Sequence, residues 1–285
     1  MHQHCYFVRT FTKSSRPAIL DVLEPGYGPL FDRLVAVLGD DERVRGMWLS
    51  GSLARGEADR ISDLDVLVAV RDDDHDAFAA EWREWLAAVT PTLIARPLPF
   101  APGSFYSLTP GRQRLDVVVE TMAWLPNTPF RSRLTVFDRD GLDQMIPAPE
   151  PGAGLSAERV AGLIEEFFRD YGMFPVVTER EDWLLGQEGV HFVRGLLYQL
   201  FVEENAPLPM MGIKRWSTKL TPEQRAVLTS LPAAAPNRES VMTAHHAVGE
   251  AFLVHARRVC DRLGVVWPAE LEAATVDYLR SYGLA

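Results

Sequence analysis

Residues 147–154 interrupt the chain with a segment that cannot form regular secondary structure. It reads Pro-Ala-Pro-Glu-Pro-Gly-Ala-Gly, and a stretch so rich in proline and glycine excludes a regular helix or strand there. The whole chain has 285 residues, a length that suggests about two domains. We therefore expect one domain over residues 1–150 and a second over residues 151–285.

The composition narrows the class of protein. Hydrophobic residues make up 47% and charged residues 24% of the chain, which is ordinary for a globular protein. The net charge of −10 argues against a large face for nucleic acid, so small or cationic partners fit better. Cys5 and Cys260 lie far apart and exclude a disulfide framework or a cysteine-rich zinc site.

No apolar run approaches the roughly 18–20 residues that span a bilayer. The sequence also begins without the basic start and apolar core of a signal peptide. These observations predict a cytoplasmic protein.

In the first half, short apolar segments alternate with helical patterns. Apolar runs over residues 44–49, 66–70 and 115–119 predict strands, and the spacing over about 29–38 and 75–88 predicts helices. This alternation indicates an α/β (α+β) domain with a small mixed sheet.

The second half has helical patterns throughout. Ser156 can cap one helix, and Thr221-Pro222-Glu223-Gln224 has the cap, first-turn proline and capping-box partner of another. Further helices are expected over about 187–204, 239–263 and 268–282, the second of these ending at Gly264. We expect an all-α bundle of about five helices.

The most informative motif lies between the first two strands. The first strand runs into Gly51-Ser52, and glycine lets a backbone approach a ligand closely. Asp63 and Asp65 stand two residues apart at the start of the second strand, so both carboxylates belong on one face. Two neighbouring carboxylates are costly without a cation between them, and Mg²⁺ prefers such oxygen ligands together with phosphate oxygens. The alternative is a solvated strand end.

A third carboxylate interrupts a later apolar strand. Asp116 lies within Leu-Asp-Val-Val-Val, where a buried lone charge is expensive unless it binds a metal or accepts a proton. The alternative is a core carboxylate paired with Arg112 or Arg114. A phosphate-cradling Gly51-Ser52 turn beside the Asp63 and Asp65 pair predicts metal-assisted chemistry on a nucleoside triphosphate, with Asp116 as the third carboxylate.

In this order and spacing, the motifs resemble those of the nucleotidyltransferase superfamily of the polymerase-beta type. The surroundings, from Gly51 to Gly56 and Ser62-Asp63, resemble the bacterial aminoglycoside and lincosamide adenylyltransferases in particular. Those enzymes also carry a helical C-terminal domain of similar size. The sequence motifs of the family match over roughly residues 47–70 and 114–120. The rest of the chain resembles the family only in its expected architecture.

The resemblance implies a role for each matched residue. Gly51 and Ser52, with Ser62 beside the acids, would bind the nucleotide; Asp63, Asp65 and Asp116 would bind Mg²⁺, with two ions expected. Asp116 would be either the third ligand or the base that deprotonates the acceptor. The implied co-substrate is ATP, and a hydroxyl of the acceptor would attack its α-phosphorus and release pyrophosphate.

Three further cations are candidates for binding the phosphates. Arg55 follows the Gly-Ser turn, and Lys214 and Lys219 lie in the densest basic stretch of the second half. In related adenylyltransferases a lysine of the helical domain reaches the phosphates, although surface lysines are also common.

On the predicted helix over 187–204, Glu188 shares a face with His191 and is a candidate substrate contact. His245, His246 and His255 lie on a later helix and are interpreted as packed or surface histidines.

These features predict a nucleotidyltransferase, specifically an adenylyltransferase, that acts on a small hydroxylated and possibly cationic acceptor, such as an aminoglycoside or lincosamide antibiotic. Two alternatives stay open: transfer to a protein or RNA acceptor, and a non-catalytic nucleotide-binding module on the same fold. Neither the acceptor, the nucleobase nor the oligomeric state is specified by the sequence.

Overall fold

A computed structural model describes residues 16–99, 101–208 and 214–284 of the chain. The chain divides into two compact units, Met1–Glu150 and Pro151–Ala285. Cys5 lies outside the described residues.

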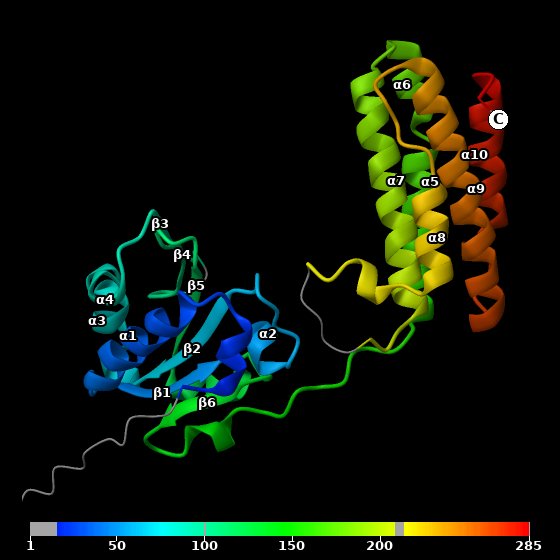
Figure 1. Cartoon of the computed structure of the whole chain (residues 1–285). Helices are drawn as coiled ribbons and strands as arrows, with labels where there is room; N and C mark the ends of the chain where they lie inside the picture. The colour runs from blue at the N-terminus through cyan, green and yellow to red at the C-terminus, as the bar shows by residue number, and fades with distance from the viewer. Residues whose placement is uncertain (1–15, 100, 209–213, 285) are drawn as a thin grey trace, which may run out of the picture. The chain divides into compact units, whose positions relative to one another are not determined.

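The first unit is built on one six-stranded mixed sheet (Figure 1). Its strands are β1 (Val44–Leu49), β2 (Leu64–Val70), β3 (Ile94–Pro97), β4 (Phe105–Leu108), β5 (Arg114–Thr121) and β6 (Leu134–Asp138). The order across the sheet is β3-β4-β5-β2-β1-β6. Only the central pair, β2 and β5, is parallel, and the other neighbours are antiparallel. The predicted mixed sheet is confirmed.

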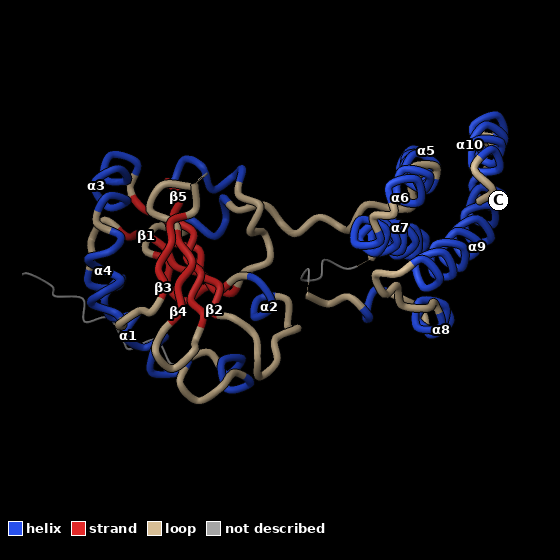
Figure 2. Tube along the Cα trace, turned by 90° about the horizontal axis from the view of Figure 1, so that it is seen from above, coloured by secondary structure: helices blue, strands red, loops and turns tan. Residues whose placement is uncertain are grey.

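Helices cover one face of this sheet (Figure 2). They are α1 (Tyr27–Asp40), α3 (His75–Ala80) and α4 (Trp82–Val89), and the single turn α2 (Gly51–Ala54) follows β1. Leu64 and Val66 of β2 and Val117 of β5 point into this main core, together with Leu34 of α1. Strand geometry then directs the alternate residues of β2 and β5 to the opposite face.

The opposite face carries a smaller core. Leu67 and Ala69 of β2 pack there with Trp48. Short 3₁₀ segments η3 (Met122–Asn127) and η4 (Leu142–Met145) contribute to it. Two further 3₁₀ segments of the first unit are η1 (Ala18–Val22) and η2 (Asp72–Asp74).

The second unit is helical, as predicted. Its elements are α5 (Ala157–Tyr171), α6 (Phe174–Arg180), α7 (Trp183–Glu204), η5 (Ser217–Lys219), α8 (Pro222–Ser230), α9 (Arg238–Leu263) and α10 (Ala269–Ser281). Helices α5, α7 and α9 pack on one another around Phe167, Leu197 and Phe252. Helix α6 is one element more than the sequence predicted, and its seven residues are too few to show a clear period.

The predicted helix ends are found where the caps were expected. The Ser156 side chain accepts a hydrogen bond from the Arg159 amide at the start of α5. Thr221 and Gln224 form a complete capping box, and Gly264 ends α9 in the left-handed conformation. Among the described helices, none combines the length and apolar character needed to cross a membrane.

Candidate active site

The turn after β1 is tied to the strand that carries the acids. The Ser50 amide donates a hydrogen bond of 2.9 Å to the main-chain oxygen of Asp65. Gly51 follows with φ of +59°, a left-handed conformation that glycine adopts without strain, and it begins the single turn α2. The sequence thus brings the Gly-Ser turn and Asp65 into direct contact.

Gly51 has no room for a side chain. A β-carbon built at Gly51 would lie 1.9 Å from Oδ2 of Asp65 and 2.7 Å from its Cγ. The α-carbon of Gly51 packs directly against the Asp65 carboxylate. Both this contact and the left-handed backbone conformation require glycine at this position. The sequence predicts that the Gly51 backbone comes close to a ligand. In the structure, the group in close contact with it is the Asp65 carboxylate.

Asp65 and Asp116 are brought together by strand register. They are paired residues on the parallel strands β2 and β5, so their side chains leave the sheet on the same face. Both are half-buried, whereas Leu64 and Leu115, one residue before each, are fully buried in the core on the other face. Parallel pairing thus brings Asp116, the third carboxylate of the predicted site, beside Asp65.

Arg114 also takes part in this cluster. Its Nη1 lies 2.9 Å from Oδ2 of Asp63, and its Nη2 lies 3.7 Å from Oδ2 of Asp116. The Arg114 amide donates to the Tyr27 hydroxyl at 3.0 Å, and burial raises the pKa of that tyrosine. The pairing of Asp116 with Arg114, one of the two alternatives, is therefore present, and Asp63 is the nearer partner.

The acids are chemically suited to a hard divalent cation. Asp65 and Asp116 present carboxylate oxygens from neighbouring strands, and Asp63, just before β2, shares the Arg114 guanidinium with Asp116. Within the described part of the chain, no three acidic, histidine or cysteine side chains are arranged as a metal site. Carboxylates are ligands that Mg²⁺ prefers, and the binding of Mg²⁺ by Asp63, Asp65 and Asp116 stays a prediction.

The other predicted nucleotide contacts of the first unit lie between Gly51 and Asp63 in the sequence. Ser52 is half-buried in α2, and its main-chain oxygen accepts from the Glu57 amide at 2.9 Å. Arg55 forms an ion pair of 3.0 Å with Glu57. The Ser62 hydroxyl bonds Asp59 at 3.0 Å, which closes the loop just before Asp63.

The remaining predicted residues belong to the second unit. Lys219 ends η5 and is half-buried, while Lys214 is exposed in the loop before it. Glu188 is exposed on α7, and it lines a pocket of that unit together with His191. Their roles toward a nucleotide or an acceptor stay predictions.

Residues 32–108 match the family model of the nucleotidyltransferase domain. The first unit carries a nucleotidyltransferase domain. The matched segment holds Gly51, Ser52, Asp63 and Asp65 of this domain and ends before Asp116. This match confirms the predicted resemblance to the nucleotidyltransferase superfamily and the prediction of a nucleotidyltransferase enzyme.

Solved structures similar to this chain include an aminoglycoside 6-adenyltransferase from Bacillus subtilis. It is 16% identical, with a TM-score of 0.42, over 90% of this chain and 97% of that one. A nucleotidyltransferase-like protein from Exiguobacterium sibiricum 255-15 is 14% identical, with a TM-score of 0.34, over 79% of this chain and 72% of the other. No curated protein matches the chain.

Arg114 belongs to the acid cluster but not to the predicted site. The sequence offers Arg114 only as a partner for Asp116, yet its shortest contact in the cluster is with Asp63. A signal was present, because Arg114 lies two residues before Asp116 on the same strand and therefore on the same face. Its reach to Asp63 could be seen only once β2 and β5 were known to be neighbours.

Proposed function

We propose that this protein transfers a nucleoside monophosphate, AMP from ATP, to a hydroxyl of a small acceptor and releases pyrophosphate. The observation that carries the proposal is the register of Asp65 and Asp116 on β2 and β5, beside a glycine that leaves no room between turn and carboxylate. The match of residues 32–108 to the nucleotidyltransferase domain supports the same reaction class.

In the proposed reaction, an acceptor hydroxyl attacks the α-phosphorus of the nucleotide. The bond between the α-phosphorus and the bridging oxygen breaks, and pyrophosphate leaves with that oxygen. Asp116 either accepts the hydroxyl proton or serves as a metal ligand while solvent accepts it. Mg²⁺ held by Asp63, Asp65 and Asp116 would supply neutralising charge for the attacking and leaving oxygens.

The chain's own groups would position the nucleotide. The Gly51-Ser52 turn lies in contact with Asp65, so a triphosphate bound there would be adjacent to the acids. Arg55, Lys214 and Lys219 are the cations proposed to offset the phosphate charge. Arg114 would keep Asp63 and Asp116 from repelling each other before the nucleotide binds.

The acceptor is proposed to be a small hydroxylated molecule that carries positive charge, as aminoglycosides and lincosamides do. The net charge of −10 favours the approach of a cation over that of an RNA.

The test is transfer of label from α-³²P-ATP, with Mg²⁺, to a panel of aminoglycosides, lincosamides and neutral polyols. We expect one labelled small-molecule product and one pyrophosphate per transfer. The matched variants are Asp65→Asn and, as a control, Asp73→Asn, an exposed acid on η2 away from the cluster.

Transfer that survives in Asp65→Asn would refute the assigned site. Label found on protein in a lysate, with no small-molecule product, would replace the acceptor by a protein. Tight ATP binding with no transfer to any acceptor would indicate a nucleotide-binding module.

A further inference from the structure

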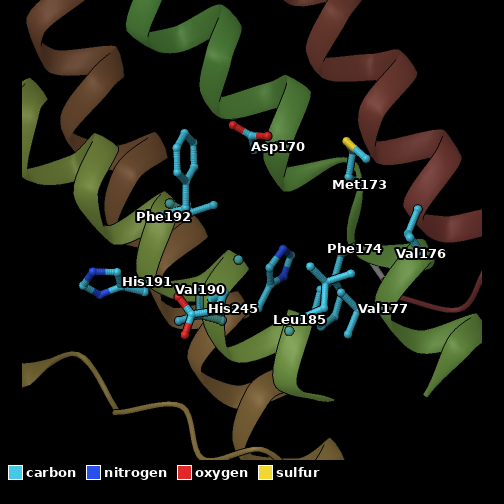
Figure 3. A pocket seen from close by; sticks show the side chains of 14 residues that line it. Asp170, Met173, Phe174, Val176, Val177, Leu185, Val190, His191, Phe192 and His245 are labelled. Carbon is cyan, nitrogen blue, oxygen red and sulfur yellow. The ribbon is translucent and has the colours of Figure 1, made fainter. Parts of the chain in front are cut away.

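The second unit contains a pocket of about 400 Å³ between α6, α7 and the end of α5 (Figure 3). Its walls are mainly apolar side chains, among them Phe174, Val177, Val190 and Val193. A volume of this size is within the range of small-molecule sites. Met173 and Phe192 line it too and are about half exposed, so the pocket opens to solvent beside them.

A buried histidine faces this pocket. His245 of α9 is 7% exposed and lies between two rings, with centroid distances of 4.1 Å to Tyr171 and 3.7 Å to Phe174. Both rings are within 10° of parallel to the imidazole, so they must cover its opposite faces. Burial lowers the pKa of His245 to about 3, which leaves the ring neutral at pH 7.

One nitrogen of that imidazole has no partner within the described chain. The ring forms a hydrogen bond with the backbone of Tyr171 that favours its protonated form, so the ring is the donor to the carbonyl oxygen. Nε2 is buried and makes no hydrogen bond to any described residue. In a neutral imidazole with one nitrogen donating, the other is an acceptor, so Nε2 has a lone pair that no described group uses, on a residue that lines the pocket.

The charge around the pocket is negative. Asp170 and Glu188 line it, and no lysine or arginine does so among residues 16–99, 101–208 and 214–284. Asp170 is engaged by Arg169 at 3.0 Å, whereas Glu188 makes no ion pair with a described residue. The pocket therefore combines apolar walls, a buried acceptor and an available carboxylate.

We propose that this pocket is a binding site for a small primary amine with an apolar body. The apolar body would lie against Phe174, Val177 and Val190, and the ammonium group would donate to acceptors of the pocket and be attracted by Glu188. An anion would meet two carboxylates, and a ligand covered with hydroxyls would leave them without partners against the apolar walls. The proposal is independent of nucleotidyl transfer, because binding is measured without nucleotide.

The test uses three probes with one body and different charge: 4-phenylbutylamine, 4-phenylbutanol and 4-phenylbutyrate. Calorimetric titration of the full chain should give the tightest binding for the amine, about twofold to fivefold weaker binding for the alcohol and weaker binding still for the acid. The Glu188→Gln variant should bring the amine down to the affinity of the alcohol. Glu179→Gln, an exposed acid on α6 that does not line the pocket, should leave the preference unchanged.

A second variant locates the probe. Gly189 lines the pocket, and a β-carbon added there would meet no atom within 4 Å, so Gly189→Leu fills the pocket without a clash at its first carbon. We expect this variant to fold with an unchanged far-ultraviolet spectrum and to lose amine binding.

Three results would overturn the proposal. Equal affinity for all three probes would show that the protein does not recognise the amine group. Amine binding that survives Gly189→Leu would show that the probe binds outside this pocket. A chain that sediments as a dimer, with Gly189→Leu restoring the monomer, would show that a second copy covers the pocket.

Discussion

The acid cluster of the first unit and the pocket of the second unit are built in opposite ways. Asp65 and Asp116 are ionisable groups kept half-exposed on neighbouring strands, with a guanidinium 3.7 Å from one of them. His245 is an ionisable group kept neutral, buried between two aromatic rings. The acids of the first unit attract a cation by charge alone, whereas the proposed pocket combines apolar walls, one buried lone pair and the Glu188 carboxylate. Strand register thus brings like charges together in the first unit, while helix packing in the second unit keeps one ionisable ring neutral.

Removal of the Asp65 charge should cause the greatest loss of activity. Asp65→Asn keeps the size of the side chain beside Gly51 but removes its negative charge. We expect transfer to fall on the order of 1,000-fold, because the acid is proposed to hold the metal that stabilises the transition state. The rate of pyrophosphate release measures this, with Asp73→Asn expected to stay near the unaltered rate. An equal loss in both variants would contradict a specific role for Asp65.

The next effect tests how tightly the turn packs on the acid. Gly51→Ala should lower transfer about 100-fold, because even a 1 Å displacement of Asp65 would spoil the alignment. We expect it to lower the free energy of unfolding by about 2–3 kcal/mol, through left-handed strain and crowding together.

Gly56→Ala is the matched control for that substitution. Gly56 has φ of +71°, so alanine is strained there too, but a β-carbon would meet nothing within 4 Å. The cost should be about 1 kcal/mol, with little change in transfer. Equal effects at both glycines, measured by urea unfolding and by transfer rate, would show that crowding against Asp65 is unimportant.

A smaller effect tests the buried imidazole through pH. The folded pKa of His245, about 3, lies below the ordinary value of 6.5, so only the unfolded chain takes up this proton between those values. The contribution of neutral His245 to the free energy of unfolding is therefore fully present above about pH 7.5. It is lost as the pH falls, by about 2 kcal/mol from pH 7 to pH 5. Urea unfolding of the unaltered chain and of His245→Gln at both pH values measures the difference in slope.

The neighbouring histidine provides the control for this experiment. His246 is largely exposed, so His246→Gln should keep the pH dependence of the unaltered chain. If His245→Gln loses as much stability between pH 7 and pH 5 as the unaltered chain, the ring is not held neutral by burial.

The smallest effect tests the guanidinium among the acids. Arg114→Gln should reduce the free energy of unfolding in EDTA by about 1 kcal/mol or less, because the ion pair with Asp63 is partly exposed. Mg²⁺ should raise the melting temperature of this variant more than that of the unaltered chain, since Asp63 and Asp116 then lack a resident cation. Arg96→Gln, on the exposed strand β3, should respond as the unaltered chain does. Equal magnesium shifts in all three proteins would contradict the idea.

The sequence predicted the parts of the fold that carry strong local patterns. Strands β1, β2 and β5 are long apolar runs, and their buried positions in the sheet explain why. Strands β3 and β6, at the two edges, and the four-residue β4 were missed. Short edge strands bury few side chains, so neither alternation nor apolar runs mark them.

The site residues that could be predicted are those marked by a pattern within a single segment or strand. Asp63 and Asp65 share a motif, and Asp116 stands out within its apolar strand. The contact of Arg114 with Asp63 depends on which strands are neighbours, which no local pattern contains. His245 was interpreted as a packed or surface residue; it is packed, but its unpartnered nitrogen follows from the positions of α5 and α6, which periodicity does not give.

The parallel pairing of β2 and β5 has a consequence for protein engineering. Asp65 and Asp116 are separated by the whole excursion through α3, α4, β3 and β4, so a break in that excursion would place one acid on each of two fragments. Neither fragment alone would contain both Asp65 and Asp116. Restored nucleotidyl transfer on mixing the fragments would therefore report that β2 and β5 had paired. The same register that assembles the cluster thus offers a split reporter whose signal depends on a single strand pairing.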